Sequence, residues 1–573
     1  GTTLTLGTSG DTVVVPSGVS LAPGGGLTLT GALVVDGGTV KLDGNYPTGS
    51  SNVALGDGAL DDGSLSGNNN TAIGDDALGE NTSGSINTAI GGQSLKANTT
   101  GVCNVGVGYA TLFDNTTGLQ NTAIGSYSLT NNTTANNNTA VGYNSLLTNT
   151  TGANNVAVGS LSGDAITTGS TNVAIGRGSL GANTTGSCNV AIGDLALVAA
   201  TTVSQNTAIG MLSMTATTSG IRNTAVGRQS MCANTTGCCN VAMGSNALAS
   251  GTTGDFNVAV GGAALGSVNT GNCNTAIGAC AMNTNTSGAN NTAVGKSALL
   301  ANTTGTQNVA IGTLALDANT SGNELTAMGY NSLGANTTGC YNVAVGDNAL
   351  AANTTGNDNT TIGMRSLLNN TTGINNTGVG RNALRENTTA ANNTAVGSSS
   401  LACNTTGASN VAVGAEALDA NTTGAENTAV GRFALTSNTE GDENTAVGRY
   451  SLGTNTTGEN NTALGHSTIE NNTTGDFNVG IGHGALQANT TADNNTAVGY
   501  QSLDANTEGH SNVAVGKGSL SANTSADENT AVGFNALADN TTGHSNVAVG
   551  ACALITNTTS RDNVGLGFCA LHA

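Results

Sequence analysis

Residues 291–307, NTAVGKSALLANTTGTQ, decide the fold, because nearly the whole chain from Asn52 onward repeats this stretch with small changes. Steps of 17 residues lead from Asn70 to Asn563 and define 30 units in register. A looser unit, one residue out of phase, begins at Asn52. A fixed period sustained for this long predicts a linear array in which each unit stacks only on its neighbours. The fold question therefore reduces to the fold of one unit.

The first part of the unit has the pattern of a short strand. With Asn291 as position 1, position 5 is glycine in every unit, as at Gly295, which indicates a special backbone conformation or no room for a Cβ atom. Position 2 is Thr or Val, position 3 is nearly always Ala, and position 4 is aliphatic or Met. This alternation of β-branched residues predicts a strand. We expect the position-4 side chains, such as Val294 and Ile311, to form aliphatic ladders inside the coil.

The second part of the unit supplies a buried anchor and a turn. Position 9 is Leu in most units, as at Leu299 and Leu316, and we expect it inside the coil. Positions 12 to 15, Asn-Thr-Thr-Gly in the unit that ends with Gly305, predict a turn in which the glycine supplies a positive φ and the Asn bonds its own backbone. A helical unit is excluded, because 17 residues cannot hold two helices with their turns and the unit is rich in weak helix formers.

The sequence therefore predicts an all-β fold, a parallel β-solenoid or β-roll of 17-residue coils. Coils about 4.8 Å apart would build a rod of roughly 145 Å from residues 52–573. Residues 1–51 do not follow the repeat and predict a short β-rich N-terminal section. The chain begins with Gly1 and ends in the middle of a unit, so we expect it to be processed or incomplete at its start and to meet or lack a cap at its end.

Composition excludes several classes of function. The net charge of −21 disfavours nucleic acid or an anionic membrane surface as partner. No stretch of 18 successive apolar residues is present, so we predict no membrane insertion. The acidic residues, such as Asp75 and Asp317, occupy variable positions of the unit, where we expect them to face water and keep the rod soluble.

Catalytic and metal-binding patterns are not found in the sequence. No histidine has a cysteine or serine partner at a meaningful spacing, and no Cys/His spacing matches a zinc site. We therefore predict that the protein is not an enzyme and needs no cofactor or metal. The five histidines are His466, His483, His510, His544 and His572.

The recurring Asn-Thr-Thr of the turn has two interpretations. It matches the acceptor pattern for N-glycosylation, which would place a sugar on almost every coil. Alternatively, the Asn and Thr side chains serve the turn and stack into ladders between coils. The candidate glycosylation sites are Asn98, Asn183, Asn302, Asn421 and Asn557.

The eleven cysteines show no repeated spacing and predict no disulfide framework. Cys552 and Cys569 both occupy position 7 of consecutive units, so stacking would bring their Cα atoms to about 4.8 Å, within the disulfide range. A disulfide and a pair of free thiols both fit this spacing.

The repeats resemble two families of fibrous proteins. Residues 155–159 (NVAVG), 172–176 (NVAIG) and 308–312 (NVAIG) resemble the head repeats of trimeric autotransporter adhesins, and the full NTAVG…AL…NTTG unit is similar to repeats of bacteriophage tail fibres and related bacterial surface fibres. The resemblance covers residues 52–573. It implies a parallel β-roll in a homotrimer, an extracellular or virion-surface location, a mechanical or adhesive role toward a receptor or cell-surface glycan, and no catalysis.

Association is also expected on physical grounds. A thin coil without aromatic residues buries little apolar surface against the entropy cost of ordering its backbone. The strand is apolar on both faces, so we expect its second face to pack against other copies, with the small Ala or Gly of position 3 allowing close approach. The sequence thus predicts a structural fibre that serves attachment. The alternatives are a self-polymerising extracellular filament or surface-layer protein and, less favoured because Thr303 and Thr304 lie beside a turn, an ice-binding protein.

Overall fold

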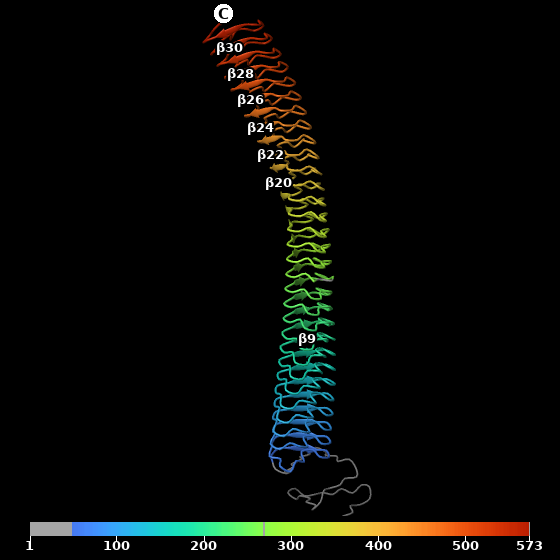
Figure 1. Cartoon of the computed structure of the whole chain (residues 1–573). Coiled ribbons are helices and arrows are strands. Elements are labelled where there is room, and N and C mark those ends of the chain that lie inside the picture. The colour runs from blue at the N-terminus through green and yellow to red at the C-terminus, as the bar shows by residue number, and fades with distance from the viewer. Residues whose placement is uncertain (1–48, 268–269, 572–573) are drawn as a thin grey trace, which may run out of the picture.

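The computed structural model describes residues 49–267 and 270–571, and within these ranges the chain is all-β with no helix. The coils stack into one continuous, gently curved rod (Figure 1). The predicted parallel β-solenoid with a 17-residue period is therefore confirmed. The predicted β-rich section at residues 1–51 lies outside the described residues, apart from its last three.

Each coil contributes one strand of three residues, taken from positions 2 to 4 of the unit. The strands are β1 (Val53–Leu55), β2 (Thr71–Ile73), β3 (Thr88–Ile90), β4 (Val105–Val107), β5 (Thr122–Ile124), β6 (Thr139–Val141), β7 (Val156–Val158), β8 (Val173–Ile175), β9 (Val190–Ile192), β10 (Thr207–Ile209), β11 (Thr224–Val226), β12 (Val241–Met243), β13 (Val258–Val260), β14 (Thr275–Ile277), β15 (Thr292–Val294), β16 (Val309–Ile311), β17 (Thr326–Met328), β18 (Val343–Val345), β19 (Thr360–Ile362), β20 (Thr377–Val379), β21 (Thr394–Val396), β22 (Val411–Val413), β23 (Thr428–Val430), β24 (Thr445–Val447), β25 (Thr462–Leu464), β26 (Val479–Ile481), β27 (Thr496–Val498), β28 (Val513–Val515), β29 (Thr530–Val532), β30 (Val547–Val549) and β31 (Val564–Leu566).

Every strand pairs in parallel with the strand of the next coil, residue on equivalent residue. Between β15 and β16, for example, Ala293 lies beside Ala310 and Val294 beside Ile311. The register steps by 18 residues only from β1 to β2, as the out-of-phase first unit predicts. Equivalent side chains of all coils therefore form columns along the rod, one column for each position of the unit.

The interior of the coil is thin and holds the columns of positions 3, 8 and 9. Ala293, Ala298 and Leu299 have no exposed surface, and their equivalents form one core along the rod. The prediction that Leu299 and Leu316 are buried is confirmed. The prediction for Val294 and Ile311 is wrong, because the inward residue of the three-residue strand is the alanine of position 3. Successive strand residues point to opposite faces, so Thr292 and Val294 point outward.

Glycine at position 5 satisfies both requirements inferred from the sequence. Gly295 has φ of 138°, and a Cβ atom there would lie 2.5 Å from the carbonyl oxygen and 2.6 Å from the carbonyl carbon of Gly312 in the next coil. Both the backbone conformation and the spacing between coils thus exclude a side chain.

Glycine at position 15 has a different role from the one predicted. Gly305 is not among the residues with positive φ, so the prediction that it supplies one is wrong. Its carbonyl oxygen accepts hydrogen bonds from the side chains of Asn291 (2.9 Å) and Asn302 (3.1 Å). Alanine replaces this glycine in some coils, as at Ala135 and Ala390, which fits an ordinary φ.

The positive φ values occur instead at positions 7, 9 and 17, as at Ser297 (56°), Leu299 (53°) and Gln307 (59°). A left-handed conformation costs an L-residue roughly 1–2 kcal/mol, and Asn tolerates it best after Gly. Asn is accordingly frequent at positions 7 and 17, as at Asn144 and Asn137. The coil therefore carries a repeated backbone cost that its packing and hydrogen bonds offset.

Two columns of buried asparagines run inside the rod. At position 1, the Asn291 side-chain oxygen accepts the backbone N–H of Asn308 (2.9 Å). At position 12, the Asn302 amide donates to the side-chain oxygen of Asn285 (2.8 Å), and Asn319 donates in turn to Asn302 (3.0 Å). Buried polar groups stabilise a fold only when they are hydrogen-bonded, and these columns meet that condition between coils.

The position-12 column shows what happens where the repeat departs from its pattern. It is continuous from Asn81 to Asn149 and is then broken, because Ile166 and Ala200 stand where the next donors belong. The side-chain oxygens of Asn149 and Asn183, which those donors would have reached, are buried without a hydrogen-bond partner. The less regular coils keep the solenoid path but have weaker bonding between coils.

Candidate interaction surface

The outer face of the sheet is the most distinctive surface of the rod. It presents Thr or Val from position 2 and Val, Ile, Leu or Met from position 4 of each coil, and position 4 is often more than a third exposed, as in Ile311 (36%) and Leu464 (47%). We call this surface, the position-2 and position-4 side chains of β1 to β31, the outer face. A contiguous apolar surface of this length is typical of an interaction site. It corrects the expectation that the position-3 residues face a neighbouring chain.

Position 6 forms a column along one edge of the outer face and carries most of the basic residues. Arg177, Arg228, Lys296, Arg381, Arg432, Arg449 and Lys517 all occupy it. Aromatic residues join them from β23 to β29. The Arg449 guanidinium lies 4.7 Å from the centroid of the Tyr450 ring, and the rings of His466, His483 and Tyr500 stack with centroids 5.0 and 5.4 Å apart. The sequence analysis described these histidines as scattered and missed that the register stacks two of them.

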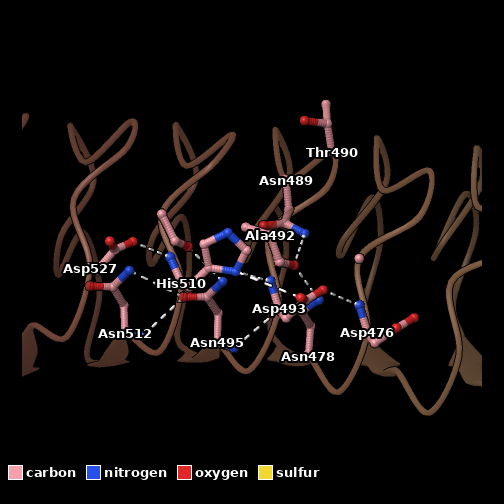
Figure 2. Close-up of polar contacts among 12 residues, drawn as sticks. Asp476, Asn478, Asn489, Thr490, Ala492, Asp493, Asn495, His510, Asn512 and Asp527 are labelled. Atoms are coloured by element: carbon pink, nitrogen blue, oxygen red, sulfur yellow. Dashed lines mark hydrogen bonds and ion pairs between the residues drawn. The ribbon is translucent and has the colours of Figure 1, made fainter.

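Position 16 forms a column along the opposite edge, and its side chains accept hydrogen bonds from the preceding coil. Figure 2 shows Asp493 accepting the backbone N–H of Asp476 (2.8 Å), while the His510 Nδ1 atom accepts that of Asp493 (2.9 Å) and Asp527 accepts that of His510 (2.7 Å). His510 Nδ1 also lies 3.7 Å from the second oxygen of Asp493. The recurrence of Asn, Asp and Ser at this position was the signal from which this column could have been predicted.

The candidate glycosylation sites lie at position 12. The side chains of Asn98, Asn183, Asn302 and Asn421 have no exposed surface, whereas Asn557 near the end of the rod is partly exposed. The Asn421 amide nitrogen donates to Asn404 and to Gly424, at 2.8 Å each. A glycan on the four buried sites would have to be attached before the coil closes, and glycosylation stays a prediction. The stacked ladder, the alternative interpretation, describes the position of these side chains.

Cys552 and Cys569 lie on adjacent coils as the register predicts, and both are free thiols. Burial, together with the neighbouring Cys552 thiol, raises the pKa of Cys569. A raised pKa disfavours the thiolate that attacks disulfides, so this pair is slow to exchange.

The described residues contain no group of three His, Cys, Asp or Glu side chains placed to hold a metal ion. No helix that could cross a membrane is found between residues 49 and 571, apart from the two undescribed positions 268 and 269. His572 lies outside the described residues. None of the protein-family models matches the chain, and a search of curated proteins finds no significant match.

Some acidic residues are less exposed than the sequence suggested. Burial raises the pKa of Asp317, and likewise of Asp164, Asp419 and Asp504, which all occupy position 10. One oxygen of Asp504 is buried without a hydrogen-bond partner. A raised pKa means that the folded chain binds the proton more tightly than the unfolded chain. This contribution to stability is therefore present at pH values below about 3.9 and is lost as the pH rises through the folded-state pKa.

Replacing Asp504 by Asn is consequently expected to raise the melting temperature at pH 7 and to leave it nearly unchanged at pH 3. The neutral amide removes the cost of a partly buried charge, which the protonated carboxyl does not have at pH 3. The matched control is Asp358→Asn, at an exposed carboxyl, for which no such pH-dependent gain is expected. A lower melting temperature of Asp504→Asn at pH 7 would contradict the assignment.

Proposed function

We propose that this chain is the shaft of a homo-oligomeric attachment fibre, a bacteriophage tail fibre or a surface adhesin, exposed outside the cell or on a virion. The observation that carries the proposal is the outer face, which runs along all 31 strands of the rod and stays uncovered in a single chain. A long rod whose only extended apolar surface lies outside needs a partner of equal length. Another copy of the same chain meets that requirement.

Three copies are the number that the resemblance to fibrous adhesins and tail fibres implies. Packing of the outer faces would remove the aliphatic side chains of position 4 from water, at about 25 cal/mol for each Å² of apolar surface covered. The gain for one coil is small, and the repetition multiplies it along the rod. Such an assembly offers a stiff spacer, and the receptor or glycan contacts of an adhesin would lie on its remaining surface.

Charged residues introduced into the outer face test the proposal. The double variant Val413→Lys and Val430→Lys places two charges on adjacent coils of this face and should lower the mass and the width of the particle in light scattering and electron microscopy. The control is Thr406→Lys with Thr423→Lys, at exposed turn positions of the same coils. Equal assembly of both double variants would reject the outer face as the contact.

A second candidate, ice binding, gains one observation that the sequence analysis did not foresee. The threonines of position 2, such as Thr360, Thr377 and Thr394 on successive coils, lie on a regular parallel sheet and point outward. An ice-binding rod would keep this face free in solution. A monomer that inhibits the recrystallisation of ice would favour this function over the fibre.

A further inference from the structure

Two columns of opposite chemistry flank the sheet from β24 to β27. On the position-6 edge, the donor column consists of Arg449, His466, His483 and Tyr500, whose side chains all end in hydrogen-bond donors. On the position-16 edge, the acceptor column of the same four strands consists of Asp442, Glu459, Asp476 and Asp493. Each strand therefore has a donor at one edge and a carboxylate at the other.

The two columns do not pair with each other within one chain. They lie on opposite edges of each three-residue strand, and no ion pair among the described residues involves Arg449. Elsewhere along the rod, basic side chains have carboxylate partners in the same chain, as in Arg177 with Asp194 (2.8 Å) and Lys96 with Asp76 (2.7 Å). Arg449 is instead held over a tyrosine ring and remains without a counter-charge.

Both columns are ordered before any partner arrives. Ring stacking fixes His466, His483 and Tyr500 in a row that advances by one coil per ring. On the other edge, one oxygen of Asp476 accepts the Glu459 N–H (2.7 Å), which leaves the second oxygen for another donor. Ordering of this kind lowers the entropy cost of forming an interface.

We propose that the donor column of one rod binds the acceptor column of a second copy of the same chain, with the two rods parallel and unshifted along their axes. Only this arrangement brings Arg449 to Asp442, His466 to Glu459, His483 to Asp476 and Tyr500 to Asp493 at once. Identical rods have identical column spacing, so one matched level brings all four into register. The proposal rests on the homo-oligomer proposed above and assigns its orientation and axial register.

Antiparallel packing of the outer faces would not use these columns. With the strands of the two rods running in the same direction, the donor edge would face the donor edge and the acceptor edge would face four like-charged carboxylates. Like charges placed opposite each other oppose association. In the parallel arrangement, a donor edge meets an acceptor edge at every contact, which forms a closed ring when the rotation between copies closes.

Nucleic acid or another polyanion is a less suitable occupant of the donor column. The ring faces of His466, His483 and Tyr500 contact one another, so they are not free to stack on bases. The remainder of the chain is strongly acidic and repels a polyanion. A second copy brings its own carboxylates at the matching spacing.

Exchange of the two columns tests the proposal in the full-length chain. The donor variant combines Arg449→Glu and His466→Glu, and the acceptor variant combines Asp442→Arg and Glu459→Arg. Each should raise the concentration needed for half-assembly about tenfold or more, whereas the chain with all four changes should assemble like the original chain. Arg381→Glu, at position 6 of β20 where position 16 is Ile374, is the control and should leave assembly unchanged.

Orientation is read separately by electron microscopy of particles that carry one gold tag on each chain. All tags should lie at the same end of the particle. Tags at both ends, or assembly that none of the charge changes affects, would overturn the proposal. If the original chain is itself monomeric, the proposed fibre fails first, so the two failures are distinguishable. Restored dissociation of a bound polyanion by the donor variant, without any effect on assembly, would assign the column to that other ligand and likewise overturn the proposal.

Discussion

Replacing Gly295 by valine is expected to open the rod locally and to cost several kcal/mol of stability. The φ of 138° would force the valine into a region that costs about 1–3 kcal/mol, and the Cβ atom would meet the carbonyl group of Gly312 at 2.5 Å. Relief of that contact requires the two coils to separate, which adds an overpacking cost of about 1–3 kcal/mol. Hydrogen exchange followed by mass spectrometry should show loss of protection in the coils on both sides of position 295.

The control is Gly305→Ala, which also brings a Cβ atom close to the next coil but at a residue with ordinary φ. The chain already carries alanine at this position in other coils, such as Ala492 and Ala526. We expect a much smaller effect than for Gly295→Val. Normal melting and protection of Gly295→Val would show that position 5 does not need glycine.

The second large effect is expected from Asn370→Ala, in the middle of the long uninterrupted part of the position-12 column. The Asn370 amide donates to Asn353 (2.9 Å) and Gly373 (3.0 Å), and its oxygen accepts from Asn387 (2.9 Å). Alanine leaves the Asn353 oxygen and one N–H of Asn387 buried without partners, at about 1–3 kcal/mol for each group. The expected loss is therefore about 2–6 kcal/mol in a thermal or denaturant unfolding experiment.

Asn183→Ala is the matched control, because the column is already interrupted on both sides of Asn183. Its amide keeps one hydrogen bond, to Gly186 (3.0 Å), and the Gly186 oxygen also accepts from Asn172 (2.9 Å). We expect a cost of about 1 kcal/mol there. Equal costs for Asn183→Ala and Asn370→Ala would mean that the bonds between asparagines add nothing to the stability of the rod.

The period, the strand, the buried Leu299 and the need for glycine at Gly295 could all be predicted from the sequence. These features follow from a pattern that repeats in every unit and from the conformational limits of single residues. The inward face of the strand could not be predicted from hydrophobicity. A three-residue strand has one inward residue, and the narrow interior opposite leucine selects the smallest residue, Ala293, while the larger Val294 remains outside.

The candidate surface was predicted only in outline. The need for a partner followed from the apolar residues, but the face was assigned to position 3 and belongs to positions 2 and 4. The buried asparagine at position 1 had a signal, because a polar residue that recurs before a strand has no role in the turn. The donor and acceptor columns emerge only from the register, which places Asp442 and Arg449 on opposite edges of one strand.

The central claim is that the rod is completed by other copies of itself, and the mass of the native particle tests it most directly. Light scattering on the full chain at low concentration is predicted to give about three times the chain mass of 55.5 kDa, with assembly weakened by lysines in the outer face. A stable, folded particle of 55.5 kDa under the same conditions would contradict the account.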